Sequence, residues 1–134
     1  MIRTGILIAA SLLATSQAAL AELTERVPSV GLDGPHSDGC ASVGRVTGLV
    51  PGGDYFLAVH ALPDAASKEK DRLGPAMLVW LCEGEGPWQG IVYAPQGKDF
   101  GECLVSNPVA RPEPYSGPCR FGWVDGHYIQ LTAG

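Results

Sequence analysis

Prolines and glycines are spread so densely through this chain that long helices have little room to form. Of its 134 residues, 11 are proline and 18 are glycine. They interrupt most windows before two turns of apolar residues at i, i+3 and i+4 spacing can accumulate. Short strands joined by turns remain, so the sequence predicts an all-β fold.

The expected strands are short segments with alternating or continuous apolar character, bounded by turn residues. They cover residues 43–50, 55–62, 76–82, 88–93, 122–124 and 128–131. The sequence EGEGP contains glycine and connects the third and fourth of these segments as a hairpin. The polar stretch PDAASKEKDR, residues 63–72, predicts a long loop or a helical turn. Together these pieces predict a small antiparallel barrel or sandwich.

The first residues have the features of a signal peptide. Arg3 supplies a positive charge, residues 5–14 form an apolar run, and Ala19-Leu20-Ala21 fits the small-x-small cleavage rule. We therefore expect residues 1–21 to be removed and the product to be periplasmic or secreted. No later stretch approaches the roughly 20 apolar residues of a spanning helix, so we expect no membrane insertion.

The four cysteines form an even set in a chain expected to reach an oxidising compartment. Two disulfides are therefore favoured over a metal site, since no CxxC or His-x-Cys spacing is present. Four cysteines allow three pairings, and the sequence alone does not select one. We favour Cys103 with Cys119, which would close a proline-rich loop. The other pair is then Cys40 with Cys82, which would tie residues 22–42, an N-terminal extension, to the core.

Residues 94–119 interrupt the strand pattern. This segment contains five prolines, three glycines and two cysteines, with little apolar alternation. A structureless loop of this length is uncommon in a compact domain. We therefore expect an ordered insertion that a disulfide holds together.

The order of several residues resembles the bacterial SH3-like (SH3b) domain family over about residues 55–130. The matching positions are Leu57, Val59, Pro63, Leu73, Val79, Leu81, Trp88, Ile91, Gly122-Trp123-Val124 and Tyr128-Ile129. The resemblance implies a small SH3-like antiparallel barrel of about five strands over residues 43–134. It carries an extra N-terminal strand and the disulfide-bonded insertion, where relatives have a tight turn. It also implies a single helical turn directly after Gly122-Trp123-Val124. Two positions depart from the family pattern, which usually has arginine at His60 and glycine at Ala76.

The resemblance also implies a function, that of a non-catalytic extracytoplasmic binding module. Relatives hold peptides, either proline-rich segments or cell-wall cross-bridges, in an aromatic groove. Trp88 and Tyr128 match such a groove, and Phe121, Tyr115 and His60 are candidates for its edges. Trp123 is instead expected in the core, because a large aromatic side chain buries much apolar area. The expected ligand is cell-wall peptide, peptidoglycan or a segment of another protein.

Two other functions remain as alternatives. A periplasmic inhibitor or immunity-like protein would bind an enzyme or toxin through the insertion, whose tip PQGKDFGE places Phe100 among charges. The insertion would otherwise only cover an open end of the barrel. A cell-wall hydrolase has the least support, because His60 and His127 are isolated and no GxSxG, HExxH or phosphate-binding loop occurs.

The remaining expectations concern partners. The formal net charge is −5 and no basic cluster is present, so nucleic acid is an improbable partner. We expect no metal, no cofactor and no catalytic residue. We also expect the protein to act as a monomer.

Overall fold

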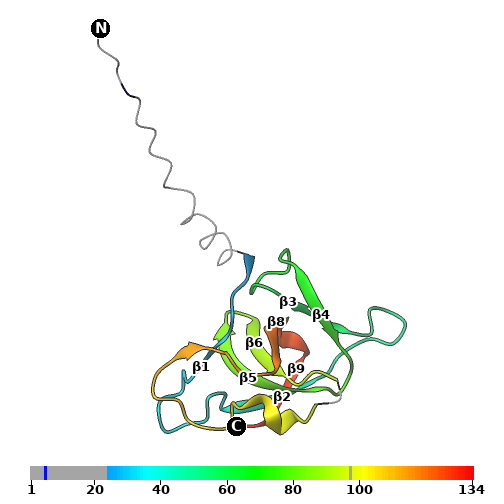
Figure 1. Cartoon of the computed structure of the whole chain (residues 1–134). Coiled ribbons are helices and arrows are strands. Elements are labelled where there is room, and N and C mark those ends of the chain that lie inside the picture. The colour runs from blue at the N-terminus through cyan, green and yellow to red at the C-terminus, as the bar shows by residue number, and fades with distance from the viewer. Residues whose placement is uncertain (1–4, 6–23, 97) are drawn as a thin grey trace.

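A computed structural model describes residue 5 and residues 24–96 and 98–134 of the chain (Figure 1). The expected signal peptide, residues 1–21, lies outside the described residues apart from residue 5. The strands in the described part are β1 (Ser29–Val30), β2 (Ser42–Val46), β3 (Leu57–His60), β4 (Glu69–Leu73), β5 (Leu78–Glu85), β6 (Trp88–Tyr93), β7 (Glu113–Pro114), β8 (Arg120–Asp125) and β9 (Ile129–Ala133). Two short 3₁₀ helices, η1 (Phe100–Cys103) and η2 (Gly126–Tyr128), accompany them. No helix among the described residues is long and apolar enough to cross a membrane.

The strands form one large sheet and one small one. The large sheet has seven strands in the order β4-β3-β8-β6-β5-β2-β9, and the small sheet pairs β1 with β7. Every pairing is antiparallel. The predicted all-β class is therefore confirmed, and each of the six expected segments overlaps a strand.

The prediction for the polar stretch 63–72 was wrong in its second half. Residues Glu69–Leu73 form β4, which pairs with β3 so that Leu73 lies opposite Leu57. Four of these five residues are charged, and charge normally argues against a strand. Because β4 is the edge of the sheet, its charged side chains stay near solvent while Leu73 alone enters the core.

The sheet curls around an inner core. Its buried members come from six strands and are Val46, Leu57, Val59, Leu73, Val79, Ile91, Tyr93 and Val124. Leu73 belongs to β4 and Val46 to β2, strands near opposite ends of the sheet order, yet both pack in this cluster. The sheet is therefore bent into a small barrel around these side chains. Each fully buried aliphatic side chain contributes roughly 1.5–3 kcal/mol to folding.

A second, outer core lies on the other face of the sheet. Here the N-terminal extension and the insertion 94–119 pack against β5, β6 and β8, and the buried residues include Val30, Val92, Val105 and Tyr115. Cys40–Cys82 fastens the extension to β5, and Cys103–Cys119 closes the insertion. This is the pairing that the loop argument favours. Both bridges indicate an oxidising, extracytoplasmic environment.

Trp123 anchors the extension to this outer face. Its side chain is 0% exposed, which confirms its predicted place in the core. The indole N–H donates a hydrogen bond to the carbonyl oxygen of Arg26 at 2.9 Å, and the Arg26 guanidinium lies 4.8 Å from the ring centroid. The same guanidinium pairs with Glu83 and Glu85. The chain before β1 is thus held against the sheet by one hydrogen bond, one cation–π contact and two ion pairs.

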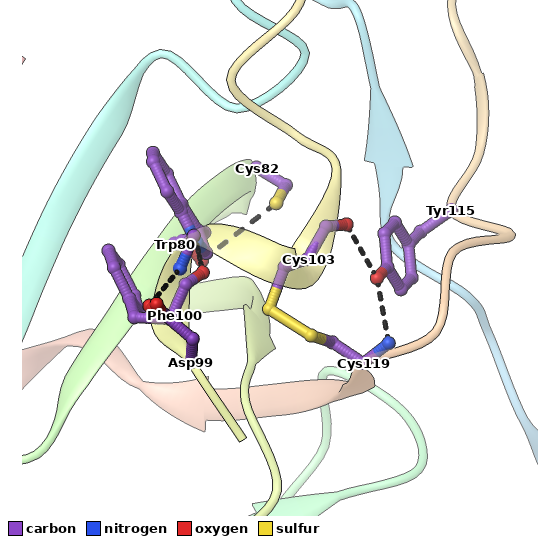
Figure 2. The surroundings of a disulfide bond; sticks show 8 residues. Trp80, Cys82, Asp99, Phe100, Cys103, Tyr115 and Cys119 are labelled. Carbon is purple, nitrogen blue, oxygen red and sulfur yellow. Dashed lines mark hydrogen bonds between the residues drawn. A yellow bond between two sulfur atoms is a disulfide. The ribbon is translucent and has the colours of Figure 1, made fainter.

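The insertion is ordered around its disulfide (Figure 2). The Tyr115 hydroxyl donates to the carbonyl oxygen of Cys103 at 2.8 Å and accepts from the backbone N–H of Cys119 at 3.0 Å. At the other end of η1, the ring of Phe100 stacks parallel to Trp80 with centroids 4.5 Å apart. The Trp80 indole N–H also donates to the carbonyl oxygen of Phe100 at 3.1 Å. The tip of the insertion therefore folds back onto β5.

Candidate ligand groove

A groove opens between the loop before β3, the start of β6 and the helix η2. Its volume is about 410 Å³, in the range of sites that hold small ligands or single peptide side chains. The lining residues are Gly48, Leu49, Val50, Asp54, Phe56, Leu57, Ala58, His60, Ala65, Trp88, Asp125 and Tyr128. They come from segments that are far apart in the sequence and meet only in the folded sheet.

Three of the predicted ligand-binding residues meet in this groove: His60, Trp88 and Tyr128. All three are half-buried, so each keeps part of its ring accessible. The His60 and Trp88 rings meet edge to face with centroids 5.5 Å apart. His60 Nδ1 lies 3.1 Å from the carbonyl oxygen of Ser67, which can only accept, so Nδ1 carries a proton. In the tautomer that carries this proton on Nδ1, Nε2 is the hydrogen-bond acceptor of the ring.

The helix η2 positions Tyr128 beside Trp88. The Asp125 side chain caps η2 by accepting from the backbone N–H of His127 at 2.9 Å, and Asp125 lies directly opposite Trp88 in the β6–β8 pairing. Gly126 donates its N–H to the carbonyl oxygen of Pro87 at 2.8 Å, and a Cβ at this position would approach that oxygen to 2.8 Å. Glycine is therefore needed for η2 to lie this close to the β5–β6 turn.

The groove has an acidic character. Asp54 and Asp125 contribute carboxylates, whereas the lining residues include neither lysine nor arginine. Phe56 is covered on one side by the Arg72 guanidinium, 4.1 Å from its ring centroid. The arrangement suits a ligand that offers apolar surface together with amide or ammonium donors.

Two other predicted residues lie elsewhere. Tyr115 is only 6% exposed and belongs to the outer core, where its hydroxyl is already bonded on both sides. Phe121 packs against that same core, and the Lys70 ammonium lies 3.9 Å from its ring centroid. Neither lines the groove. The insertion between β6 and β8 holds Tyr115 in the outer core, away from the residues that line the groove.

The sequence reasoning missed Asp54, Phe56 and Asp125 as groove residues. Asp125 could have been found, because it lies between the Gly122-Trp123-Val124 strand and the helical turn that brings Tyr128 to the groove. Asp54 and Phe56 carry no comparable signal. They reach the groove because the loop before β3 folds over the barrel end, which depends on long-range packing.

A separate polar cluster lies between β4, β6 and β8. The Tyr93 hydroxyl donates to Asp71 Oδ2 at 2.9 Å, and Arg120 Nη1 lies 3.1 Å from the same oxygen. Burial and the hydrogen bond to Asp71 raise the pKa of Tyr93. Burial alone would raise the pKa of Asp71, but hydrogen bonds from the Arg72 N–H, Tyr93 and Arg120 lower the pKa below its usual value. The Asp71 carboxylate, the Tyr93 hydroxyl and the Arg120 guanidinium thus all have hydrogen-bond partners within the protein.

The described residues contain no group of three or more His, Cys, Asp or Glu side chains placed to hold a metal ion.

His127 is exposed and contacts Tyr128 edge to face, with centroids 5.2 Å apart. Cys40, which the sequence places near His36 and Asp38, is bonded to Cys82. Its sulfur is therefore not present as a thiolate.

Comparison with known proteins finds no matching family model, no matching curated protein and no matching solved structure.

Proposed function

We propose that this protein is a non-catalytic extracytoplasmic binding module that holds a peptide in the groove of His60, Trp88 and Tyr128. The peptide belongs to the cell wall or to a protein segment, and the chain resembles bacterial SH3-like domains. The observation that carries the proposal is convergence: three of the five residues that the family resemblance implies for ligand binding line one groove. Residues 1–21 act as the removed signal peptide, in keeping with the two disulfides.

The chemistry of the groove supports a peptide ligand. Half-buried aromatic rings provide rigid apolar contact area, and the Tyr128 hydroxyl adds a polar group at its edge. Asp54, Asp125 and His60 Nε2 provide acceptors for the N–H groups of an extended chain. In this proposal the protein acts without cofactor or metal, does not bind nucleic acid and does not insert into a membrane.

Co-sedimentation with purified cell-wall sacculi tests the proposal. The oxidised, exported protein is expected to sediment with sacculi, and Trp88→Ala is expected to lower the bound fraction at least tenfold. Phe121→Ala is the matched control, since it removes a half-buried aromatic ring outside the groove. Equal loss in both variants would indicate a fold defect, and equal retention would exclude the groove. If sacculi bind nothing, the same pair of variants is compared against a panel of extended peptides.

The inhibitor function is the second candidate, and it has less support. Its expected contact residue, Phe100, already stacks on Trp80 within the protein, so one face of its ring is not available to a partner. The side chain as a whole is half-buried. The acidic net charge still suits a basic enzyme as partner. Reversing the charges of Lys98 and Glu102 in the insertion tests it, because this change would abolish inhibition and leave sacculus binding unaltered. The hydrolase alternative requires turnover of a murein substrate that is lost on changing His60 or His127.

A further inference from the structure

The two disulfides differ in their exposure to solvent. Cys40 is 0% exposed and Cys82 is 6% exposed, so the bridge that fastens the N-terminal extension is buried at both ends. Cys103 is also 0% exposed, but its partner Cys119, which directly precedes β8, is half-buried. Each bridge thus has one fully buried cysteine, and the difference between the bridges lies at the other one. Among the four cysteines, Cys119 is the one that a reagent in solution reaches most easily.

The charges around the two bridges differ as well. Cys119 lines a hollow of about 420 Å³, whose charged members are Lys70, Asp71 and Arg120. Cys82 lines a hollow of about 460 Å³, whose charged members are Asp33 and Glu83. When the ion-pair partners of these side chains are added, a carboxylate to the first and a guanidinium to the second, the first site is neutral and the second remains negative. A thiolate is an anion, so the charge around Cys82 repels it and the charge around Cys119 does not.

We propose that Cys119 is a site of thiol–disulfide exchange, at which a dithiol reductant opens the Cys103–Cys119 bridge of the folded protein. A thiolate of the reductant attacks Cys119 Sγ, the bond to Cys103 Sγ breaks, and Cys103 leaves as a thiolate that takes up a proton. The second thiol of the reductant then loses its proton, attacks the mixed disulfide at the reductant's own sulfur and releases Cys119. Two electrons and two protons pass from the dithiol to the bridge, and the reductant becomes a disulfide.

Tyr115 holds the two ends of the opened bridge together. Its hydroxyl donates to the carbonyl oxygen of Cys103 at 2.8 Å and accepts from the backbone N–H of Cys119 at 3.0 Å, and neither hydrogen bond requires the sulfur atoms to be joined (Figure 2). Cys40–Cys82 still fastens the extension to β5. Opening is therefore expected to be reversible and to leave the barrel folded. The inference does not depend on the proposed peptide groove, because no residue that lines the groove belongs to the insertion.

Reduction of the folded protein, followed by mass spectrometry, tests the inference. The oxidised, exported protein is treated with dithiothreitol, quenched with acid at intervals, and labelled with N-ethylmaleimide in denaturant. Cys103 and Cys119 are expected to become labelled at least tenfold faster than Cys40 and Cys82. When reduction itself is carried out in denaturant, the two bridges should open at similar rates, because their folded surroundings are lost. Equal rates in the folded protein, or faster opening of Cys40–Cys82, would overturn the proposal.

A monothiol identifies the attacked sulfur. With mercaptoacetate, a thiol that carries a carboxylate, the mixed disulfide is expected on Cys119 and not on Cys103. Arg120→Gln is expected to slow its formation at least twofold at low salt, because one positive charge beside Cys119 is removed. Arg45→Gln is the matched control, since it removes an exposed arginine from β2 and leaves this hollow unchanged. A mixed disulfide on Cys103, or equal rates in the two variants, would contradict the proposed site.

Discussion

The imidazole of His60 meets the indole of Trp88 edge to face, with ring centroids 5.5 Å apart. The two residues belong to β3 and β6, which are not neighbours in the sheet because β8 lies between them. His60 pairs with Trp123 on β8, and Trp88 pairs with Asp125 on the same strand. The wall of the groove is therefore built across three strands, and its shape depends on the docking of the β3–β4 hairpin onto β8.

Trp88→Ala is expected to cost little stability. The Trp88 side chain is half-buried at a groove wall, so we expect the free energy of unfolding to fall by about 1 kcal/mol. Trp123→Ala removes a fully buried indole and its hydrogen bond to Arg26, and should cost about 3–5 kcal/mol. Urea denaturation of both variants measures the difference. Similar losses would show that Trp88 is a core residue and would weaken its assignment to a binding surface.

Ala76→Gly is expected to stabilise the protein. Ala76 has φ 66°, in the left-handed region that a Cβ disfavours by roughly 1 kcal/mol. Its backbone N–H donates to the carbonyl oxygen of Val46 at 2.9 Å, which keeps the turn before β5 in place. Glycine relieves the strain, and a gain of up to about 0.5 kcal/mol should remain after its greater entropy loss on folding.

Thermal or urea unfolding of Ala76→Gly measures this gain. Ala58→Gly, in the ordinary extended backbone of β3, is the control and should lose about 0.5–1 kcal/mol. A loss at both positions would contradict the expectation.

Tyr93→Phe is expected to lower stability and to weaken its dependence on alkaline pH. Losing the hydrogen bond to Asp71 should cost about 1–2 kcal/mol near pH 7. The folded state raises the pKa of Tyr93, so the stability linked to its protonated form is present below about pH 10, the unfolded pKa of tyrosine. That stability is lost as the pH rises above this value, and phenylalanine has no such proton to lose.

Urea unfolding between about pH 7 and pH 11 tests this expectation, since the range spans the unfolded pKa of tyrosine. The gap in stability between the native protein and Tyr93→Phe should narrow above about pH 10. Tyr55→Phe, which changes an exposed tyrosine, should follow the native protein throughout. A constant gap for Tyr93→Phe would mean that its ionisation is not linked to folding.

Removing the two disulfides should have unequal effects. The bridges are separated by 42 residues for Cys40–Cys82 and by 16 for Cys103–Cys119. On the loop-entropy model, replacing each pair by serine should cost about 4 and about 3 kcal/mol respectively. Denaturant unfolding of the two double variants compares them. A larger loss for the shorter loop would indicate that strain or residual unfolded structure, rather than loop length, determines the stabilisation.

Much of the fold is predictable from local signals, and β4 shows where they fail. Residues 88–93 were expected as a strand and form β6 with the same bounds, because β-branched and aromatic residues follow a glycine-containing turn. β4 has only Leu73 as an apolar residue, so its pairing with β3 depends on the hairpin and not on its own composition. The short β1–β7 pair was also beyond prediction, since it joins the two segments that pack on the outer face.

The candidate site was only partly predictable, for a reason that Tyr115 illustrates. Trp88 and Tyr128 adjoin strand ends, and strand ends at one end of a barrel meet in space. Tyr115 lies in the insertion, whose path is determined by the Cys103–Cys119 bridge and by packing on Val30 and Val105. Such long-range contacts leave no periodic pattern in the sequence. Aromatic character alone therefore did not distinguish a groove residue from a core residue.

The order of the bridges along the chain bears on how the protein matures. Cys40 joins Cys82, the second cysteine in the chain, and the third, Cys103, joins the fourth, Cys119. The two covalent loops therefore do not overlap. A chain that enters an oxidising compartment with its N-terminus first presents each cysteine to its native partner before any competitor arrives. Export in that direction would favour the native bridges over the two mispaired isomers, and it would lessen the need for thiol–disulfide reshuffling, which is slow.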